Sequence, residues 1–368
     1  MADSQSPKVS LPKVIVGGKE IELSNISSLV VKKDLDQPDY VQISLSNLAD
    51  SESGGDKFSA SLKPGTDLIV KIKVEGESEQ ELFKGYVHGD DPTYDAHSPV
   101  GTDLQGMNAM HKLSRGRKTR TFTNQTDQQI IQKVISEAGL SVDFGREPPT
   151  LRHEHLHQNN MTDLEFLRMR AARTGRVIFC EDKKIFYTKR EKDQGPVATL
   201  DYNTEGSGAL ENFKPKMSTA GQVKKVICHG WDPFQSTRKA QMMECKAEGG
   251  GSPLGGEGGS SAFGDNPELH VFDIPFRSKG DGDLLAKSIL EERQMNFINA
   301  EATGLGNAQI KPGKVIELKL GGKESRFNGK YYVVGCEFAY SHSSSGMGEG
   351  SGMGGFKGKY KLQRDAGM

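Results

Sequence analysis

Two matched stretches in the middle of the chain decide how it is organised: NQTDQQIIQKVISEAG, from Asn124 to Gly139, and NMTDLEFLRMRAARTG, from Asn160 to Gly175. Both begin with Asn-x-Thr-Asp, both end on a glycine at the same offset, and the copies lie 36 residues apart. Apolar residues recur at helical spacing between the two ends. Each stretch is therefore predicted to be one amphipathic helix.

Every shared position has a physical role at a helix end. The threonine is followed three residues later by Gln or Glu, which is the pattern of a capping box. The aspartate lies in the first turn, where the helix dipole favours negative charge, and the glycine suits a left-handed C-terminal position. The residues are Thr126, Asp127, Gln129 and Gly139 in one copy and Thr162, Asp163, Glu165 and Gly175 in the other.

An alternating segment precedes each helix, and a short apolar run follows it. The preceding segments are KTRTFTN and HEHLHQN, and the following runs are LSVDF and RVIFC. The sequence therefore predicts a small α/β domain over residues 106–195, built from two strand–helix–strand units. We expect the second helix's arginines to face solvent or another subunit: Arg168, Arg170 and Arg173.

β-rich segments flank this domain. Leu68, Val70, Ile72 and Val74 are spaced by two, as in a half-buried strand. We predict a tube-like antiparallel β-barrel over residues 1–105 and a second one over 196–368, the latter with one helix in DGDLLAKSILEERQMNF. The glycine-rich stretch near 248–264 has too few large apolar groups to offset its ordering entropy and is predicted to be a mobile loop. The fold class expected is α+β, mainly β, with two barrels flanking the α/β domain.

Composition limits the classes of function. The formal net charge is −1, which gives no dominant attraction to nucleic acid or to an anionic membrane. The four cysteines have no CxxC spacing, so we expect reduced thiols rather than a disulfide framework or a zinc ribbon. There is no secretory signal and no apolar run of bilayer length. We expect assembly in the bacterial cytoplasm and no membrane insertion.

Three histidines form the one pattern that suggests a metal. His153, His155 and His157 alternate, so on a strand they would share one face and could present several imidazoles to one ion. The alternative is an exposed strand face that precedes a helix cap. No Asp or Cys with ligand spacing accompanies them, so we favour the second interpretation and expect neither a metal nor another cofactor.

A basic cluster, Arg115, Arg117, Lys118 and Arg120, raises the possibility of nucleic-acid binding. Stacking aromatics are nearly absent, with only Phe122 at the edge, so a solvated or subunit-facing patch is favoured. No G-x-S-x-G, H-E-x-x-H or kinase set occurs, and no catalytic residue is predicted. Triads assemble in space rather than in sequence, so the missing motifs are only weak evidence against an enzyme.

Two long segments resemble a known family. GMNAMHKLSRGRKTRTFTNQTDQQIIQKVISEAGL and QNNMTDLEFLRMRAARTGRVIFCEDKKIFY are similar to the centre of the bacteriophage late-control gene D proteins, the tail-hub family. That family also includes the hub portion of valine–glycine-repeat spike proteins and of extracellular contractile injection systems. The similarity extends from LKPGTDLIVKIKV upstream to FKGKYKLQR downstream, so it covers about residues 20–364.

The resemblance implies an assembly role. Such hubs resemble a trimer in which each chain contributes two related β-barrels, so six barrels form a ring. The ring matches a sixfold tail tube on one face and a threefold spike on the other, and tube assembly starts on it. The implied partners are a hexameric inner tube protein, a separate trimeric spike protein and other baseplate proteins, and the expected location is a tail or injection particle.

Several alternatives stay open. The chain could instead be a cell-wall-degrading enzyme carried by such a machine, or a nucleic-acid binder that uses Arg115 to Arg120. The machine could be a phage tail, a type VI system or a released injection particle. Larger members of the family continue into an oligonucleotide-binding-type domain and a needle of repeats, which is why we expect the spike to be a separate protein.

Overall fold

The computed structural model describes residues 10–46, 62–74, 78–93, 101–203, 208–232, 241–249, 267–276, 278–321, 326–341 and 355–365. Most of the predicted glycine-rich loop, residues 250–264, lies outside the described residues. The first third contains β1 (Ser10–Val16), β2 (Lys19–Ile21), a 3₁₀ turn η1 (Leu23–Asn25), β3 (Ile26–Asp34), β4 (Tyr40–Leu45), β5 (Asp67–Val74), β6 (Gln80–Thr93) and β7 (Gly101–Met107).

The middle third contains both predicted helices. Its elements are a 3₁₀ turn η2 (Ala109–Ser114), β8 (Lys118–Thr126), α1 (Asp127–Glu137), β9 (Ser141–Asp143), β10 (Arg152–Met161), α2 (Asp163–Arg173), β11 (Arg176–Glu181) and β12 (Lys184–Lys189). The last third contains β13 (Thr199–Asp201), β14 (Leu210–Met217), β15 (Lys225–Asp232), β16 (Gln241–Glu248), β17 (Glu268–Val271), α3 (Lys279–Met295), β18 (Ile298–Leu305), β19 (Val315–Lys319), β20 (Gly329–Ser341) and β21 (Phe356–Arg364).

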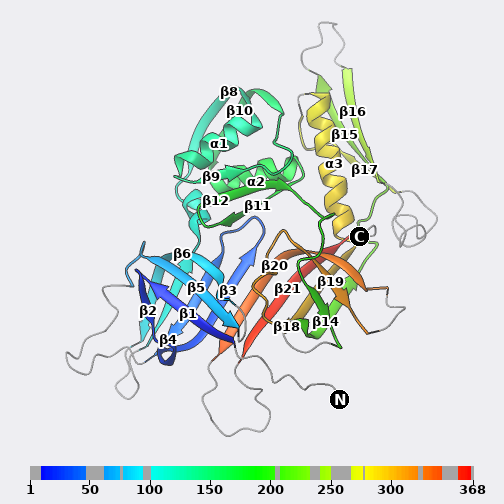
Figure 1. Cartoon of the computed structure of the whole chain (residues 1–368). Helices are drawn as coiled ribbons and strands as arrows, with labels where there is room; N and C mark the ends of the chain where they lie inside the picture. The colour runs from blue at the N-terminus through cyan, green and yellow to red at the C-terminus, as the bar shows by residue number, and fades with distance from the viewer. Residues whose placement is uncertain are drawn as a thin grey trace.

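One large antiparallel sheet contains strands from both ends of the chain. Its hydrogen-bonded path runs β14-β18-β21-β20-β3-β4-β7-β6-β5-β1-β2, and β19 and β13 branch from β20. In Figure 1 the amino-terminal strands form one lobe of the lower layer and the carboxyl-terminal strands form the other. The prediction of a mainly β, antiparallel protein is confirmed.

Strand β20 joins the two lobes. Its first residues pair with β19, as in Val315 opposite Tyr332, whereas the stretch from Gly335 to Ser341 pairs with β3 along the same edge. Strand β21 pairs with its other edge. The change of partner coincides with an irregularity between Val333 and Gly335, where a Cβ on residue 335 would collide with the Asp34 carboxylate.

The two separate closed barrels expected from the sequence are not seen in the described strands. The hydrogen-bonded path is open and runs from β14 at one end to β2 at the other. The physical reason is that the edge of β3 pairs with β20 instead of closing its own lobe. The two lobes therefore share one continuous backbone ladder.

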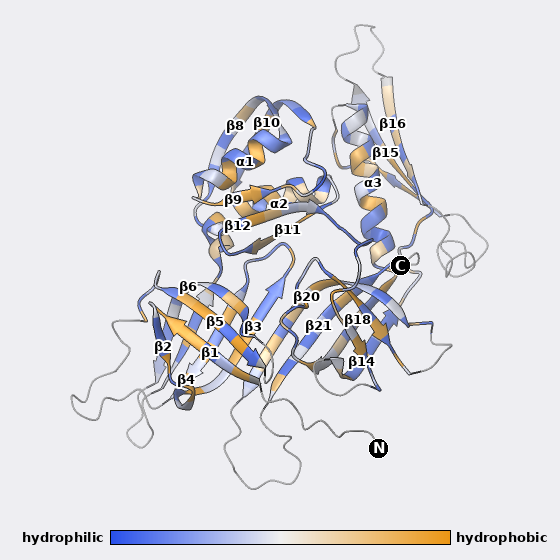
Figure 2. Ribbon diagram, viewed as in Figure 1, coloured by the Kyte–Doolittle hydropathy of each residue, from blue (hydrophilic) through white to orange (hydrophobic). Residues whose placement is uncertain are grey.

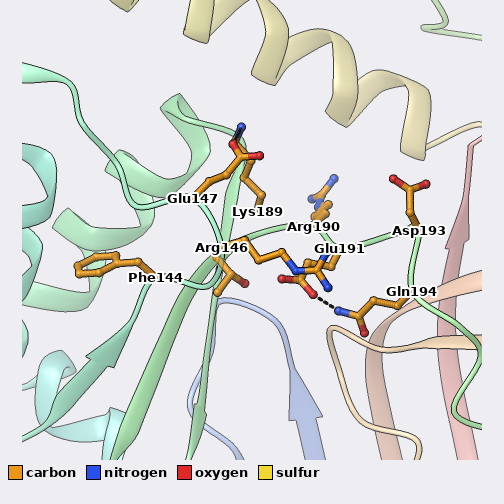
Figure 3. Close-up of a pocket in the computed structure, with 9 residues that line it drawn as sticks. Phe144, Arg146, Glu147, Lys189, Arg190, Glu191, Asp193 and Gln194 are labelled. Carbon is orange, nitrogen blue, oxygen red and sulfur yellow. Dashed lines mark hydrogen bonds and ion pairs between the residues drawn. The ribbon is translucent and has the colours of Figure 1, made fainter.

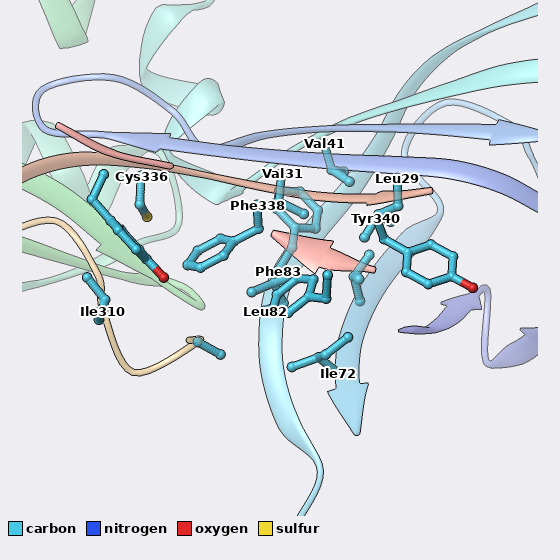
Figure 4. Close-up of a cluster of buried hydrophobic side chains, with 14 of the residues drawn as sticks. Leu29, Val31, Val41, Ile72, Leu82, Phe83, Ile310, Cys336, Phe338 and Tyr340 are labelled. Carbon is cyan, nitrogen blue, oxygen red and sulfur yellow. The ribbon is translucent and has the colours of Figure 1, made fainter. Parts of the chain in front are cut away.

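A single hydrophobic core extends across this junction. Leu29 and Val31 on β3 and Phe338 on β20 are fully buried, and Phe83 of β6 is 1% exposed in the same cluster (Figure 4). The Phe338 ring packs against Phe356 and Tyr360, with centroids 5.6 and 6.0 Å away. Apolar and polar residues alternate along these strands (Figure 2), which is the period-2 pattern of a sheet with one buried face.

Both strand–helix–strand units of the middle domain are present, as β8–α1–β9 and β10–α2–β11. Both capping boxes form, with Thr126 and Thr162 as the helix caps. The first residue of each repeat has a positive φ, 52° at Asn124 and 46° at Asn160, which asparagine tolerates better than most residues. Strand β8 pairs with β10, and β12 lies between β11 and β9.

The region 196–368 contains more than a second β-lobe. Strands β16, β15 and β17 form a separate sheet that packs on α3, beside the middle domain in Figure 1. The sequence interpretation assigned these strands to the second barrel. They separate from it because Val226, Cys228 and Cys245 are buried against the apolar face of α3, which includes Leu285 and Ala286. The proposed domain boundaries at 105 and 195 stay predictions.

The junction core makes a stability prediction. Replacing Phe338 by Ala would leave a cavity between β3, β20 and β21, and we expect the free energy of unfolding to fall by about 3–5 kcal/mol in urea denaturation. The matched control is Phe272→Ala, because Phe272 is 68% exposed. That change should alter the free energy of unfolding by no more than about 0.5 kcal/mol. Equal effects of the two changes would contradict a core shared by both lobes.

Candidate functional site

The first aspartate of the repeat is buried at the start of α1. Asp127 is 1% exposed and accepts two hydrogen bonds from Arg170 of α2, from Nε (3.0 Å) and Nη2 (2.8 Å). His153 Nε2 lies 3.0 Å from Asp127 Oδ1. The carboxylate of one unit is therefore held by two side chains of the other unit.

The second aspartate is held in the reciprocal way. Asp163 is 3% exposed at the start of α2, and it accepts from Lys118 Nζ (2.6 Å) and Arg120 Nη2 (2.8 Å), both on β8 of the first unit. Gln158 Nε2 donates to Asp163 Oδ1 at 2.9 Å. The two units are thus interlocked, because each one contributes cations that neutralise the other's carboxylate.

Burial and charge act in opposite directions on Asp127. Burial alone would raise its pKa, but the hydrogen bond from His153 and the charge of Arg170 outweigh burial, so the pKa is lowered. Burial likewise opposes the charged form of Arg170, but the Asp127 charge outweighs it and raises the pKa of that guanidinium. Both groups are therefore ionised together, as a buried ion pair.

The expectation that all three α2 arginines face solvent or a subunit is wrong for two of them. Arg168 is exposed, but Arg170 is 3% exposed and pairs with Asp127. Arg173 donates to both oxygens of Asp281 on α3, at 2.8 and 2.7 Å. The burial of Arg170 could have been predicted from its place in the helix. It lies three residues after Leu167 and four after Phe166, and so on the same helix face as these apolar residues.

The basic cluster, which lies just before β8 and on its first residues, is not an open cationic patch. Lys118 and Arg120 pair with Asp163, and Arg120 also pairs with Glu137. Arg117 donates to Glu165 at 3.1 Å and to the Asn160 carbonyl at 2.6 Å. Only Arg115, among the four cluster residues, has no carboxylate partner among the described ion pairs. Two of the four charges, those of Lys118 and Arg120, therefore neutralise a carboxylate in the interior of the domain.

The three histidines line one groove of about 360 Å³ together with Arg170, Arg173 and Ser278. His153 faces Asp127, and His157 Nδ1 lies 3.0 Å from Thr121 Oγ1. Within the described ranges, no group of three or more His, Cys, Asp and Glu side chains is placed to hold a metal ion. The sequence interpretation did not anticipate that His153, which lines this groove, contacts the buried Asp127 carboxylate.

A second pocket, of about 260 Å³, lies where β12 leads into the chain toward β13 (Figure 3). Its cations are Arg146, Lys189 and Arg190, and its anions are Glu147, Glu191 and Asp193. Lys189 pairs with Glu147 at 2.5 Å, and Gln194 donates to Glu191. Cations and anions balance in this pocket, so it has no unbalanced charge with which to select a charged ligand.

Short polar contacts fix the middle domain on its neighbours. Asp36, in the turn between β3 and β4, exchanges backbone and side-chain hydrogen bonds with Ile178 of β11, at 2.7 and 2.8 Å. Burial raises the pKa of the Asp36 carboxyl. Lys84 of β6 pairs with Asp182 at 3.0 Å, and the Arg173–Asp281 pair joins α2 to α3. The middle domain is therefore bound both to the large sheet and to the α3 layer.

This architecture is the fold of solved tail proteins. A 43 kDa tail protein of prophage MuSo2 from Shewanella oneidensis matches with a TM-score of 0.69 and 14% identity, over 97% of this chain and 99% of that one. A tail protein of Neisseria meningitidis MC58 matches with a TM-score of 0.66 and 14% identity, over 97% of both chains. A component of the Escherichia coli type VI secretion system matches with a TM-score of 0.57 and 14% identity, over 92% of this chain and 73% of that one.

The family follows from the sequence itself. A family model described as the Alg8 N-terminal domain matches residues 6–341, and the chain belongs to that family. No curated protein matches the chain. Among the described residues, none of the helices has the length and apolar character needed to cross a bilayer.

The interlocked aspartates make a second stability prediction. Asp127→Asn leaves Arg170 buried without a counter-charge, and we expect the free energy of unfolding to fall by about 3–5 kcal/mol. The control is Glu147→Gln, which removes the Lys189–Glu147 pair, whose carboxylate side chain is 66% exposed. That loss should be far smaller than the loss in Asp127→Asn, because an ion pair on the surface is screened by solvent.

The difference in the free energy of unfolding between Asp127→Asn and wild type should also depend on pH. Asp127 has a lowered pKa when folded, so its stabilisation is fully present above its unfolded pKa of about 3.9 and is lost as pH falls through the folded value. The gap in unfolding free energy should therefore narrow below about pH 4. A gap that stays equally wide at pH 2.5 would contradict an ionised Asp127.

Proposed function

We propose that this chain is a structural hub protein of a contractile tail or contractile injection system. In this role it is a homotrimer that joins a sixfold inner tube to a threefold spike and initiates tube assembly. The shared fold of the solved tail and secretion-system proteins supports a place in such a machine. We further propose that the chain is related to the late-control gene D hub proteins.

The β3–β20 ladder is the observation that carries the proposal. It fixes two β-lobes of one chain in a single continuous sheet with one core. Three chains would then supply six lobes whose spacing is set by backbone hydrogen bonds rather than by a flexible linker. A rigid pair of lobes is what a connector between threefold and sixfold symmetry requires, because each pair must present two equivalent positions to the tube.

The proposed partners follow from that role. One face of the ring would receive a hexameric tube protein, and the other would receive a separate trimeric spike protein, with further baseplate proteins around the rim. We propose that the chain assembles in the bacterial cytoplasm and becomes part of the particle. The internal pairing of Lys118 and Arg120 with Asp163 supports a role without nucleic acid.

An enzyme carried by the machine is the second candidate, and one observation favours testing it. His153 and Ser278 both line the groove, and the buried Asp127 carboxylate lies 3.0 Å from His153. The Asp127 carboxylate, however, is already engaged on both oxygens by Arg170. Ser278 Oγ also accepts the hydrogen bond that caps α3, from the Asp281 backbone. We therefore propose that this group of residues is structural and the chain is not an enzyme.

The enzyme alternative has a direct test. Purified wild type and His153→Ala should both leave peptidoglycan undigested in zymograms. Clearing by wild type that is lost in His153→Ala, while that variant keeps its thermal unfolding midpoint within a few degrees, would overturn the non-enzymatic proposal. Lysozyme in the same gel is the positive control.

The hub role predicts an oligomeric state and a template activity. Light scattering after gel filtration should give three times the 40.2 kDa mass of the chain. Added at substoichiometric amounts to its tube protein, the trimer should shorten the lag of tube polymerisation. A chain that stays monomeric at about 100 μM and leaves tube assembly unchanged would contradict the proposal, since hubs of this kind act only as assembled rings.

A further inference from the structure

The three most exposed large apolar side chains in the described parts of the molecule lie on, or directly after, the strands of the sheet formed by β16, β15 and β17. Trp231 is 62% exposed, Phe272 68% and Met242 54%, and no other large apolar residue there is as exposed. Exposed apolar residues scattered singly are ordinary, but a group of this kind on one sheet marks an interaction surface. Tryptophan, phenylalanine and methionine are also enriched in protein interfaces.

The strand register places this group on one face. Trp231 on β15 lies directly opposite Met242 on β16, and His229 lies opposite Glu244. Opposed residues of an antiparallel pair project to the same side of a sheet. Phe272, just after β17, joins this side because its ring stacks on His229 with centroids 4.2 Å apart. We call this surface the Trp231 face; it comprises Trp231, Met242, Phe272, His229, Glu244 and Glu248.

Nothing in the described residues covers this face, whereas the opposite face is filled. Val226, Cys228 and Cys245 point the other way and are fully buried under α3. Gly282 of α3 approaches the sheet so closely that a Cβ there would meet the Cys245 sulfur at 2.5 Å. The sheet therefore has one face in a core and one apolar face that no described residue covers.

The Phe272 ring of the Trp231 face is held in place before any partner arrives. The Phe272 ring lies 6° from parallel to the His229 imidazole, and His229 Nε2 is 2.9 Å from His270 Nδ1. A ring that is already stacked loses little conformational freedom on binding, and pre-organised anchors bind at lower entropic cost.

The outer edge of β16, next to this face, has no backbone partner among the described residues. Strand β16 has eight residues and pairs only with β15 within the described residues. No described residue pairs with its other edge, and the N–H and C=O groups of such an edge form a template for an added strand. A strand added there would place alternate side chains beside Met242, Glu244, Lys246 and Glu248.

Area and charge indicate what binds. The three exposed apolar side chains offer on the order of 300 Å², well short of the roughly 800 Å² per partner of a standard interface. A second copy docked by this face alone would therefore be weakly held, whereas an extended segment also gains the backbone bonds of β16. Glu244 and Glu248 on this edge strand are 41% and 66% exposed, and they pair with Lys246 at 3.1 Å and with Lys225 at 3.4 Å. Lys225 also pairs with Glu268 at 3.3 Å, so three carboxylates meet two lysines and one negative charge is left in excess.

We propose that β16 and the Trp231 face dock an extended segment of another protein. The segment adds a strand to the edge of β16, with a large apolar side chain beside Met242 and basic side chains beside Glu244 and Glu248. The proposal goes beyond the hub role and does not depend on it, because the docking surface lies within one chain.

Trp231 is the sole tryptophan of the chain, so its fluorescence reports directly on this face. The probes are two nine-residue peptides. In the first, one phenylalanine is followed at alternate positions by lysine, serine and lysine, and the second has the reverse sequence. One of them suits parallel pairing with β16 and the other antiparallel pairing. Titration into the full-length protein should give a saturable blue shift of the emission. Peptides with lysine replaced by glutamate, or with N-methylated backbone, should bind at least about tenfold more weakly.

Protein variants supply the matched controls. Met242→Glu should weaken the better peptide by about tenfold or more, because it places a charge at the apolar anchor position. Met169→Glu makes the same change at an exposed methionine of α2, 43% exposed, and should leave binding unchanged. Circular dichroism melting of both variants checks that they fold.

Three results would overturn the proposal. Absence of a shift at millimolar peptide would show that the face does not take a strand. If the glutamate-containing and N-methylated peptides bind as tightly as the original peptides, the Trp231 face is a non-specific apolar surface. A blue shift that appears on concentrating the protein alone, together with a doubled mass in sedimentation, would assign the face to a second copy of the chain.

Discussion

The hydrogen-bonded ladder between β3 and β20 is the constraint on which the rest of the molecule depends. It places Val31 opposite Phe338 and so brings the first and last thirds of the chain into one sheet. Strand β20 can serve both lobes because it is long enough to pair with β19 at its start and with β3 at its end. Everything above the sheet is attached to it at a few defined points, such as the Asp36 turn beneath β11.

In the α/β domain above that sheet, buried ion pairs determine how the two strand–helix–strand units are placed against each other. Apolar side chains hold the α/β domain together, but they would tolerate small shifts of one unit against the other. The paired aspartates do not, since a carboxylate that loses its cation in the interior is costly. Arg170 and Asp127, together with Arg120 and Asp163, thereby fix a single register between the two units.

The parts of the fold that sequence could predict are those decided locally. The capping boxes at Thr126 and Thr162 depend on residues three positions apart, and both form as expected. The shared ladder was missed because it pairs residues about 300 positions apart. The separate α3 layer was missed because packing between a helix and strands that are not its neighbours in sequence leaves no short pattern. Arg170 was misplaced for a related reason. A charge on an apolar stripe is explained only by its partner, and that partner, Asp127, lies 43 residues earlier.

The pairing of β3 with β20 also has a consequence for synthesis. The two strands lie about 300 residues apart, so at roughly 5–20 residues per second the ribosome delivers β20 some 15–60 s after β3. During that interval β3 has one unpaired edge, and the amino-terminal lobe lacks Phe338 in its core. Contacts of such long range also slow the search for the native state. The edge of β3 therefore stays unpaired until the last segment of the chain has been synthesised. An unpaired strand edge is prone to aggregation, so we expect the yield of folded protein to depend on chaperones that bind the chain during translation.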